Sequence, residues 1–213
     1  MAAPQLAFDP ARHAYTLGDE PLISVTQMLE KMGLSGCPFW TPEARARGTA
    51  VHKIALLIGK RLQGRTAEEI VTNSLWDPAR TAPVLVPYGM ACAKWYAKTG
   101  LTPELVETPV HSVTLKLAGT LDLCGLLPSG ERMLVDFKSG DPEAAADLQT
   151  ALYVFLLREC LGIEVKFRTV VWLQKDGEFK QFPPRPVGGP DLMTAISAVN
   201  VYHWRVKHRR LSV

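Results

Sequence analysis

The chain has 213 residues, of which 47% are hydrophobic and 21% are charged. This composition excludes a disordered chain, and the length is sufficient for a sizeable hydrophobic core. The apolar runs are too short to span a bilayer, and the first residues carry neither a basic region nor an apolar stretch. We therefore expect a soluble cytoplasmic protein with no secretory signal and no membrane association.

The net charge of +3 is unevenly distributed along the chain. It is −2 over residues 1–40, +5 over 41–100, −5 over 101–160 and +5 over 161–213. Clustered carboxylates can bind a cation, and a basic surface can bind a polyanion. The pattern is consistent with a cation-binding centre between two basic segments, but an ordinary solvated surface also produces such unevenness.

The first segments are short. Residues 6–23 are expected to be extended, with turns at Asp9-Pro10 and Gly18-Asp19. Ser24 and Gln27 have the spacing of a capping box, which predicts a short helix to about Met32 followed by a loop over 33–40.

A longer helix is predicted to begin at Thr41-Pro42, where an N-cap hydroxyl precedes proline at the first helical position. Its apolar stripe runs from Val51 to Leu62, and Gly64 is expected to end it. A second capping box at 66–69 predicts a short helix before Asp77-Pro78. The pattern over 84–99, closed by Gly100, predicts another helix.

After residue 100 the sequence alternates in the manner of strands, with helical stripes between them. The predicted segments are strands at 104–113, 115–127 and 132–138, a helix at 143–161, a hairpin of 165–174 with 178–182, a proline-rich loop to Pro190 and a helix at 191–207. The predicted class is α/β (α+β), with a central mixed β-sheet flanked by helices and an N-terminal helical segment. We expect one domain, 1–213, with a helical part over 1–100, a sheet and helix over 101–182 and a basic C-terminal helix over 183–213.

Asp136 and Lys138 carry the clearest chemical signal. Residues two apart in a strand share a face, and the turn at 128–130 can bring Asp122 beside them. Paired carboxylates repel each other unless a cation lies between them, and oxygen ligands suit Mg²⁺ or Mn²⁺. The alternative is an exposed strand with a simple ion pair. We expect Val135 and Phe137 to be buried on one face of the strand and the helix at 143–161 to cover the other face. Charged residues on a strand covered on both faces need an explanation, which favours the metal site.

Four short motifs occur in a fixed order, namely Gly48–His52, Gly119–Asp122, Asp136–Gly140, and Gln149 followed by Tyr153. In this combination the sequence resembles the PD-(D/E)XK nuclease superfamily, and within it the RecB-like and phage-type exonucleases. The resemblance extends over most of the chain and implies a restriction-endonuclease-like core.

The resemblance also implies roles for individual residues. Asp122 and Asp136 would bind the metal, with the main-chain carbonyl of Phe137 as a further ligand. His52 would reach the same metal from its helix, and Lys138 would be the catalytic lysine. A core or surface histidine is the alternative for His52.

Three further residues are weaker candidates. Gln149 and Tyr153 share a helix face and would position Lys138 or the nucleic-acid backbone, although ordinary helix-surface residues can have this spacing. Glu107 is a candidate for a second metal or water contact, and a solvent-facing carboxylate is equally consistent with its position.

Basic residues provide candidate DNA contacts. Three of them, Arg45, Arg47 and Lys53, belong to the His52 helix, and four more, Arg205, Lys207, Arg209 and Arg210, lie at the C-terminus. The C-terminal group also fits the preference for cations at helix C-termini. The expected partner is DNA, as ends or single strands, and a recombination or single-strand-binding protein could associate with the enzyme.

The expected activity is that of a Mg²⁺- or Mn²⁺-dependent DNA exonuclease in phage or bacterial recombination and repair. A structure-specific endonuclease and a catalytically silent nucleic-acid-binding protein are the alternatives. The four cysteines have neither CxxC pairs nor the spacing of an iron–sulfur cluster, so we expect no such cluster.

Overall fold

The computed structural model describes residues 4–9, 12, 14–35, 41–63, 77–140 and 144–211. The predicted helix after the second capping box, its neighbour Gly64 and the second half of the 33–40 loop lie outside the described residues. The side chain of Arg45 lies outside them as well.

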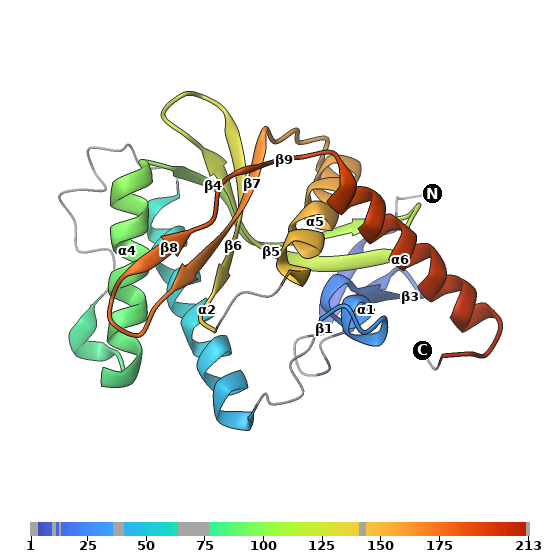
Figure 1. Ribbon diagram of the computed structural model, residues 1–213, viewed down its shortest axis with the longest axis horizontal. Coiled ribbons are helices and arrows are strands. Elements are labelled where there is room, and N and C mark those ends of the chain that lie inside the picture. The colour runs from blue at the N-terminus through green and yellow to red at the C-terminus, as the bar shows by residue number, and fades with distance from the viewer. Residues whose placement is uncertain are drawn as a thin grey trace.

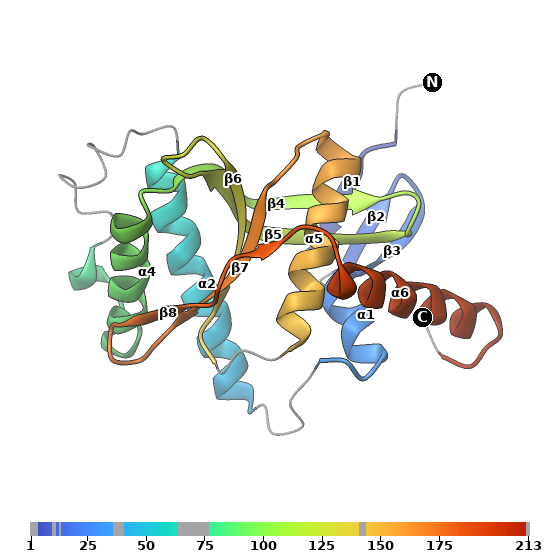
Figure 2. The ribbon, with the colours of Figure 1, turned by 45° about the horizontal axis from the view of Figure 1, so that its top comes forward.

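Helices and strands occur in the order expected from the sequence, starting with strands and ending with a long helix (Figures 1 and 2). They are β1 Leu6–Asp9, β2 Ala14–Leu17, β3 Glu20–Ser24, α1 Val25–Lys31, α2 Pro42–Leu62, the 3₁₀ turns η1 Pro78–Arg80 and η2 Pro83–Leu85, α4 Val86–Thr99, β4 Thr102–Ser112, β5 Leu117–Leu126, β6 Arg132–Lys138, α5 Ala145–Leu161, β7 Phe167–Leu173, β8 Phe179–Gln181, β9 Arg185–Pro186 and α6 Pro190–Lys207.

The strands of the described residues form one nine-stranded sheet with the order β1-β2-β3-β5-β6-β7-β8. In addition, β4 pairs with β5, and β9 pairs with β7. The pairs β3–β5 and β6–β7 are parallel and the other pairs are antiparallel. The predicted mixed sheet flanked by helices is therefore confirmed.

Two hydrophobic clusters hold the helices against the sheet. The α2–α4 cluster joins these two helices to one face of β6 and β7 through side chains such as Val135, Phe137 and Val171. The α5–α6 cluster joins α1, α5 and α6 to the other face through Leu134 and its neighbours. Figure 1 shows the two groups of helices on opposite sides of the twisted sheet. Because both faces are covered, the Asp136 side chain in the middle of β6 is buried in the interior.

Local sequence signals explain where several helices begin and end. Ser24 Oγ accepts a hydrogen bond from the Gln27 N–H at 3.1 Å, and the Ser24 N–H donates to Gln27 Oε1 at 3.3 Å, which confirms the capping box. Thr41 caps α2 in the predicted way. Gly100 and Gly162 end α4 and α5 in the left-handed conformation that glycine favours.

Some boundaries differ from the prediction. The fifth strand begins at Leu117 and not at residue 115, because Leu115 and Lys116 belong to the turn after β4, where Lys116 has φ of 47°. The proline-rich loop contains the two-residue strand β9, which pairs with the start of β7. Proline has no N–H to donate, so such a strand is confined to a sheet edge.

Strands β4 and β5 change faces together at Glu107 and Asp122. Val106 packs in the α2–α4 cluster and Val110 in the α5–α6 cluster, although residues four apart in a regular strand share a face. Glu107 lies between them with φ of 47°, an uncommon conformation for a residue other than glycine. Asp122 and Glu107 lie between the paired residues Val106–Leu123 and Thr108–Leu121, and the irregularity places Asp122 between the two helical layers.

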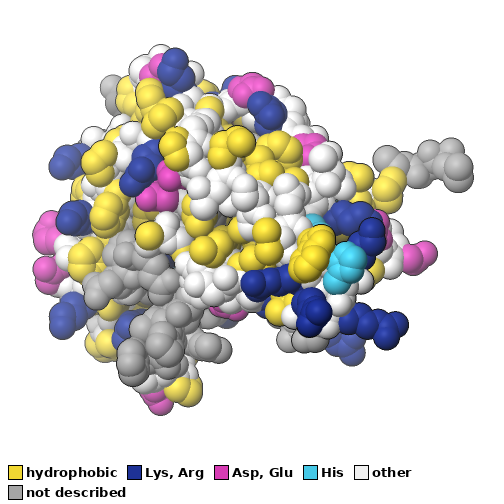
Figure 3. Space-filling model, turned by 45° about the vertical axis from the view of Figure 1, so that its right-hand side comes forward, with side chains coloured by type: hydrophobic (Ala, Val, Ile, Leu, Met, Phe, Trp, Pro, Cys, Tyr) yellow, Lys and Arg dark blue, Asp and Glu magenta, His cyan; other side chains and the backbone are white. Residues whose placement is uncertain are grey.

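Helix α6 packs on α5 and α1, on the side of the molecule away from α2 (Figures 1 and 2). Figure 3 shows Lys, Arg and His side chains gathered with hydrophobic ones on this side. Among the described helices, none combines the length and apolar character needed to cross a membrane.

Candidate active site

Asp122 lies where β5 separates from β6. The antiparallel pairing of the two strands runs from Leu126 to Leu123 on β5 and ends there, opposite Val135. Beyond this point Asp122 Oδ2 accepts a hydrogen bond from the Phe137 N–H at 2.8 Å. The carboxylate thus replaces a main-chain acceptor, and the separation of the strands leaves its other oxygen free to face α2.

Helix α2 brings His52 to that oxygen, with His52 Nδ1 3.3 Å from Asp122 Oδ1. The imidazole is 32% exposed and the carboxylate 13%, so the pair is largely shielded from water. Gly48, one turn earlier, faces the end of β6. A Cβ added to it would lie 3.8 Å from Ser139 Oγ, an ordinary contact, so the close approach does not require glycine at this position.

Glu107 completes a group of potential metal ligands. One ligand atom each of His52, Glu107 and Asp122 lies within 4.8 Å of the others. The positive φ of Glu107 is the type of backbone outlier that clusters at functional sites. Glu107 was only a weak candidate from the sequence, because its position near Asp122 depends on the register of two strands and on an irregularity within one of them.

Asp136 and Lys138 form a second part of the site, on the α5 side of β6. Lys138 Nζ lies 2.8 Å from Asp136 Oδ2 and donates a hydrogen bond to Gln149 Oε1 at 3.0 Å. Asp136 is 2% exposed and lies outside the group of three ligands. The ammonium is therefore held between a buried carboxylate and an amide oxygen from the first turns of α5.

Tyr153 packs where Gly119 leaves space. A Cβ on Gly119 would lie 2.6 Å from Tyr153 Cε1, so any other residue there would displace the ring. Next to it, the hydroxyl groups of Thr120 and Tyr15 are 2.8 Å apart. The motif Gly119–Asp122 and the motif of Gln149 and Tyr153 therefore pack against each other, with the Tyr153 ring in the space left by Gly119.

The charges of the site perturb each other. The Asp122 carboxylate raises the pKa of His52 to about 9. Burial opposes ionisation of Asp122, but His52, Lys138 and the Phe137 N–H together outweigh it and hold the pKa of Asp122 below its usual range. Burial raises the pKa of Glu107 to about 7, with a further contribution from Asp122. The pKa of Asp136 is also raised by burial, against the opposing effect of Lys138.

The donor set of this site fits a divalent cation. Two carboxyl groups and an imidazole meet at one point, and burial, with repulsion from Asp122, raises the pKa of Glu107 to about 7. Carboxylate oxygens suit Mg²⁺ and Mn²⁺, and imidazole suits the transition metals better. His52, Glu107 and Asp122 could hold such an ion with little rearrangement.

The predicted DNA-contacting residues fall into two separate places. Arg47 and Lys53 lie on α2, with Arg47 half-buried and Lys53 exposed. The C-terminal group lies at the end of α6 or just beyond it, away from α2. The structure therefore does not bring the two basic segments together around the carboxylates.

Comparison with known proteins identifies the family. A sequence model of the PD-(D/E)XK nuclease superfamily matches residues 34–187. The chain belongs to the PD-(D/E)XK nuclease superfamily. No curated protein matches the chain. Among solved structures, the crystal structure of SSO0001 has 10% sequence identity and a TM-score of 0.38, with 84% of this chain and 83% of that chain covered.

Membership of the PD-(D/E)XK nuclease superfamily implies a metal-dependent phosphodiester hydrolase that acts on nucleic acid. The sheet flanked by helices is consistent with the restriction-endonuclease-like core of this superfamily. The potential metal ligands and the Lys138 pair both lie within the matched residues.

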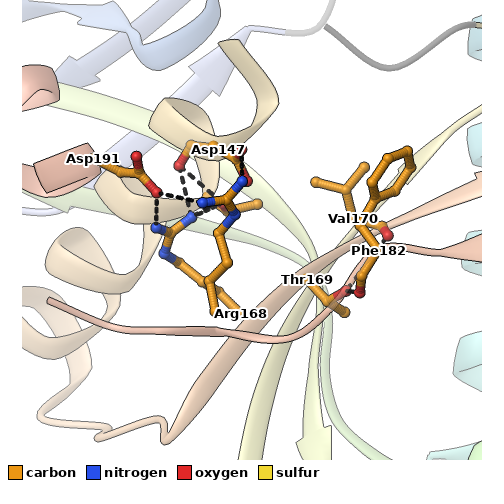
Figure 4. Close-up of polar contacts among 8 residues, drawn as sticks. Asp147, Arg168, Thr169, Val170, Phe182 and Asp191 are labelled. Atoms are coloured by element: carbon orange, nitrogen blue, oxygen red, sulfur yellow. Dashed lines mark hydrogen bonds and ion pairs between the residues drawn. The ribbon is translucent and has the colours of Figure 1, made fainter. Parts of the chain in front are cut away.

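Sequence reasoning missed two features around the site of this PD-(D/E)XK protein. Tyr96 of α4 is buried and lines a small pocket with His52, Glu107 and Asp122, whereas the sequence indicated only that it belongs to a helix. Arg168 is 2% exposed and forms a buried network with Asp147 and Asp191 (Figure 4). A single arginine in a strand gives no signal in the sequence that it will be buried.

Proposed function

We propose that this protein is a Mg²⁺- or Mn²⁺-dependent DNA exonuclease that hydrolyses phosphodiester bonds from DNA ends in phage or bacterial recombination and repair. The observation that carries the proposal is the convergence of His52, Glu107 and Asp122 beside the pair of the buried Asp136 with Lys138. Carboxylates, imidazole and a lysine held in this way are suited to hydrolysis of a phosphate diester.

Each residue has a proposed task in the reaction. His52, Glu107 and Asp122 would hold a divalent ion, which when bound would activate water and neutralise charge on the phosphate. The ammonium of Lys138, fixed by Asp136 and Gln149, would orient the attacking water and stabilise the negative charge that develops on the phosphate oxygens. Asp136 and the Phe137 carbonyl are further candidates for contacts with the ion.

Action on DNA ends is supported by the resemblance of the ordered motifs to RecB-like and phage-type exonucleases. The presence of Asp122, Asp136 and Lys138 argues against a silent binding protein, because a buried Asp136 beside the largely shielded Asp122 reduces stability and a binding role does not require this arrangement. We propose that the basic side chains Arg47 and Lys53 contact the DNA backbone close to the site.

Digestion of end-labelled linear DNA tests this function. We expect release of nucleotides from single- or double-stranded linear DNA with Mg²⁺ or Mn²⁺, and no release with EDTA. Lys138→Met is expected to abolish release, whereas the control Lys166→Met, which changes an exposed lysine at the other end of the sheet, is expected to retain it.

Covalently closed circular DNA separates the two nuclease classes. An exonuclease leaves the circle intact under conditions that degrade the linear form. Rapid cutting of the circle would replace the exonuclease proposal with an endonuclease, and absence of cleavage of either form by the wild type would overturn the proposed function.

A further inference from the structure

A row of side chains crosses three strands from the proposed catalytic lysine. The strand register places Lys138 opposite Trp172 on β7, and Trp172 opposite Lys180 on β8. Residues directly opposite each other in neighbouring strands project from the same face of a sheet. The three side chains therefore share the face that carries Asp136, which is the face that α5 and its Gln149 approach.

Phe182 adds a second aromatic ring next to this row. Its N–H donates a hydrogen bond to the Val170 carbonyl at 3.0 Å, which places it opposite Val170 and so on the same face. Figure 4 shows the Phe182 ring beside the Val170 side chain. Lys180 Nζ lies 5.3 Å from the centroid of the Phe182 ring, so the cation and the ring are neighbours at one surface.

The two aromatic side chains are not part of the core. Trp172 and Phe182 are each partly exposed, and neither belongs to a hydrophobic cluster of the described residues. By contrast, Val171 and Leu173, which flank Trp172, are buried in the α2–α4 cluster. Packing in the interior therefore does not account for a tryptophan at this position.

Lys180 presents its charge to solvent at the same place. It is exposed and forms no ion pair with a carboxylate of the described residues. The nearby Lys94 is different, because it pairs with Glu178. A positive charge next to two partly exposed rings matches the chemistry of nucleic acid, in which phosphates alternate with flat bases.

We propose that Trp172, Lys180 and Phe182 form a subsite for a single DNA strand whose reacting phosphate lies at Lys138. The inference rests on the proposed nuclease function. Strands in a sheet are about 4.8 Å apart, so the row extends about 10 Å from Lys138 to Lys180. With a rise of about 3.4 Å per stacked nucleotide, the row accommodates two to three nucleotides.

The chemistry of the subsite selects a single strand over a duplex. The bases of a duplex are stacked on one another, so they offer no free face to Trp172 or Phe182. An unpaired strand offers both its base faces and its phosphates, and stacking on aromatic side chains is tolerant of sequence. The subsite thus defines the path of the strand on the β8 side of Lys138.

Binding of a labelled oligothymidylate to the EDTA-treated protein tests the subsite without cleavage. Phe182→Leu preserves apolar volume but removes the stacking ring, and we expect about 10-fold weaker binding. Lys180→Gln is expected to reduce the slope of log affinity against log salt by about 0.7. The control Lys166→Gln, an exposed lysine just before the other end of β7, is expected to bind like the wild type.

Trp172 is tested in two ways because its replacement could affect folding. Trp172→Tyr preserves a stacking ring and is expected to bind within about twofold of the wild type. Trp172→Leu is expected to bind about 10-fold more weakly. Urea unfolding of both variants gives the fraction of unfolded protein under the binding conditions. The loss of affinity is assigned to the missing ring only where it is larger than this fraction explains.

The outcomes separate this inference from the proposed function. Binding of the single strand by Phe182→Leu, Lys180→Gln and Trp172→Leu at wild-type affinity would overturn the subsite, even if the wild type cleaves DNA. An equal loss of affinity for blunt duplex would overturn the assignment to a single strand. If the variants lose binding but the wild type cleaves no DNA with Mg²⁺ or Mn²⁺, the subsite stands and the proposed catalytic function fails.

Discussion

The first turns of α5 contact two clusters of charged side chains that differ in the balance of positive and negative groups. On one side, Arg168 donates hydrogen bonds to the Asp147 carbonyl, Thr150 and Asp191, and Arg185 pairs with the same two aspartates (Figure 4). Two arginines there meet two carboxylates. On the other side, the carboxyl groups of Glu107, Asp122 and Asp136 face His52 and Lys138, with a smaller contribution from Lys60 at Glu107. His52 is a cation only while it is protonated.

The difference supports the proposal that the active-site cluster holds a cation. The arginine cluster neutralises itself, so it can serve as a clamp that joins β7, α5 and α6. The active-site cluster has three carboxyl groups against Lys138 and His52, so its charges cancel only with a proton on His52 and another on a carboxyl group, and its pKa values are displaced accordingly. Arg168 also holds the residues on both sides of Gln149, whose oxygen holds Lys138. The arginine cluster therefore helps to fix the position of Gln149 and, through it, of Lys138 in the active-site cluster.

The largest effect is expected from Asp122→Asn. This change removes a proposed metal ligand and the partner of His52, and we expect the rate of DNA cleavage to fall by about 10³-fold or more. Asp191→Asn is the matched control in the arginine cluster, and its cleavage rate should stay within about 10-fold of the wild type. If Asp122→Asn and Asp191→Asn lose activity to a similar extent while equally folded, the active-site cluster has no special role in cleavage.

Arg168→Met is expected to act on stability. Removal of one partner of a buried ion pair leaves Asp191 without its closest cation, and we expect a loss of about 3–5 kcal/mol in the free energy of unfolding, measured with urea. Arg185 is 51% exposed, so Arg185→Gln should cost about 1 kcal/mol or less. Equal losses in the two variants would show that burial does not determine the strength of this network.

Gly119→Ala tests the contact between the motif around Asp122 and helix α5. The added Cβ would overlap the Tyr153 ring, and we expect about 1–3 kcal/mol of destabilisation by urea unfolding, with slower cleavage because the ring moves. Gly188→Ala adds the same atom where nothing lies within 4 Å and should have little effect. Wild-type stability in Gly119→Ala would show that the ring moves without cost.

The smallest effect concerns pH. The folded-state pKa of His52, about 9, exceeds the unfolded value of about 6.5. The contribution of His52 to folding stability is therefore complete below about pH 6.5 and is lost as pH rises through 9. Glu107, with a pKa of about 7, also retains its proton better when folded, so stability falls further from about pH 4.5 to 7. We expect the Tm of EDTA-treated protein to fall by at least about 2 °C from pH 6 to 9.5.

Two variants and one ligand sharpen the pH prediction. His52→Gln should remove the fall in Tm above pH 7, and Glu107→Gln should remove the part below it. With Mn²⁺ present, stabilisation by the ion should grow as pH rises, because His52 must lose its proton to bind a metal. A Tm that rises with pH in the EDTA-treated wild type would contradict the charges assigned to the site.

Much of the fold could be predicted because its signals are local. The caps at Ser24 and Thr41, the glycines after α4 and α5, and the alternation in β6 depend on residues a few positions apart. The pairing of Lys138 with Asp136 is of the same kind, because i and i+2 share a face of any strand. The boundary errors lie in turns, where small changes of backbone angle end a strand.

The sequence by itself determined the order of the elements, the family and the Asp136–Lys138 pair. Only the tertiary structure decided which residues join them. Glu107 reaches His52 because β4 and β5 change faces together. The C-terminal basic residues are remote because α6 packs on α5. Trp172 and Lys180 lie in line with Lys138 because of the register of three strands. Register and packing depend on contacts between distant segments, and composition and spacing along the chain do not specify them.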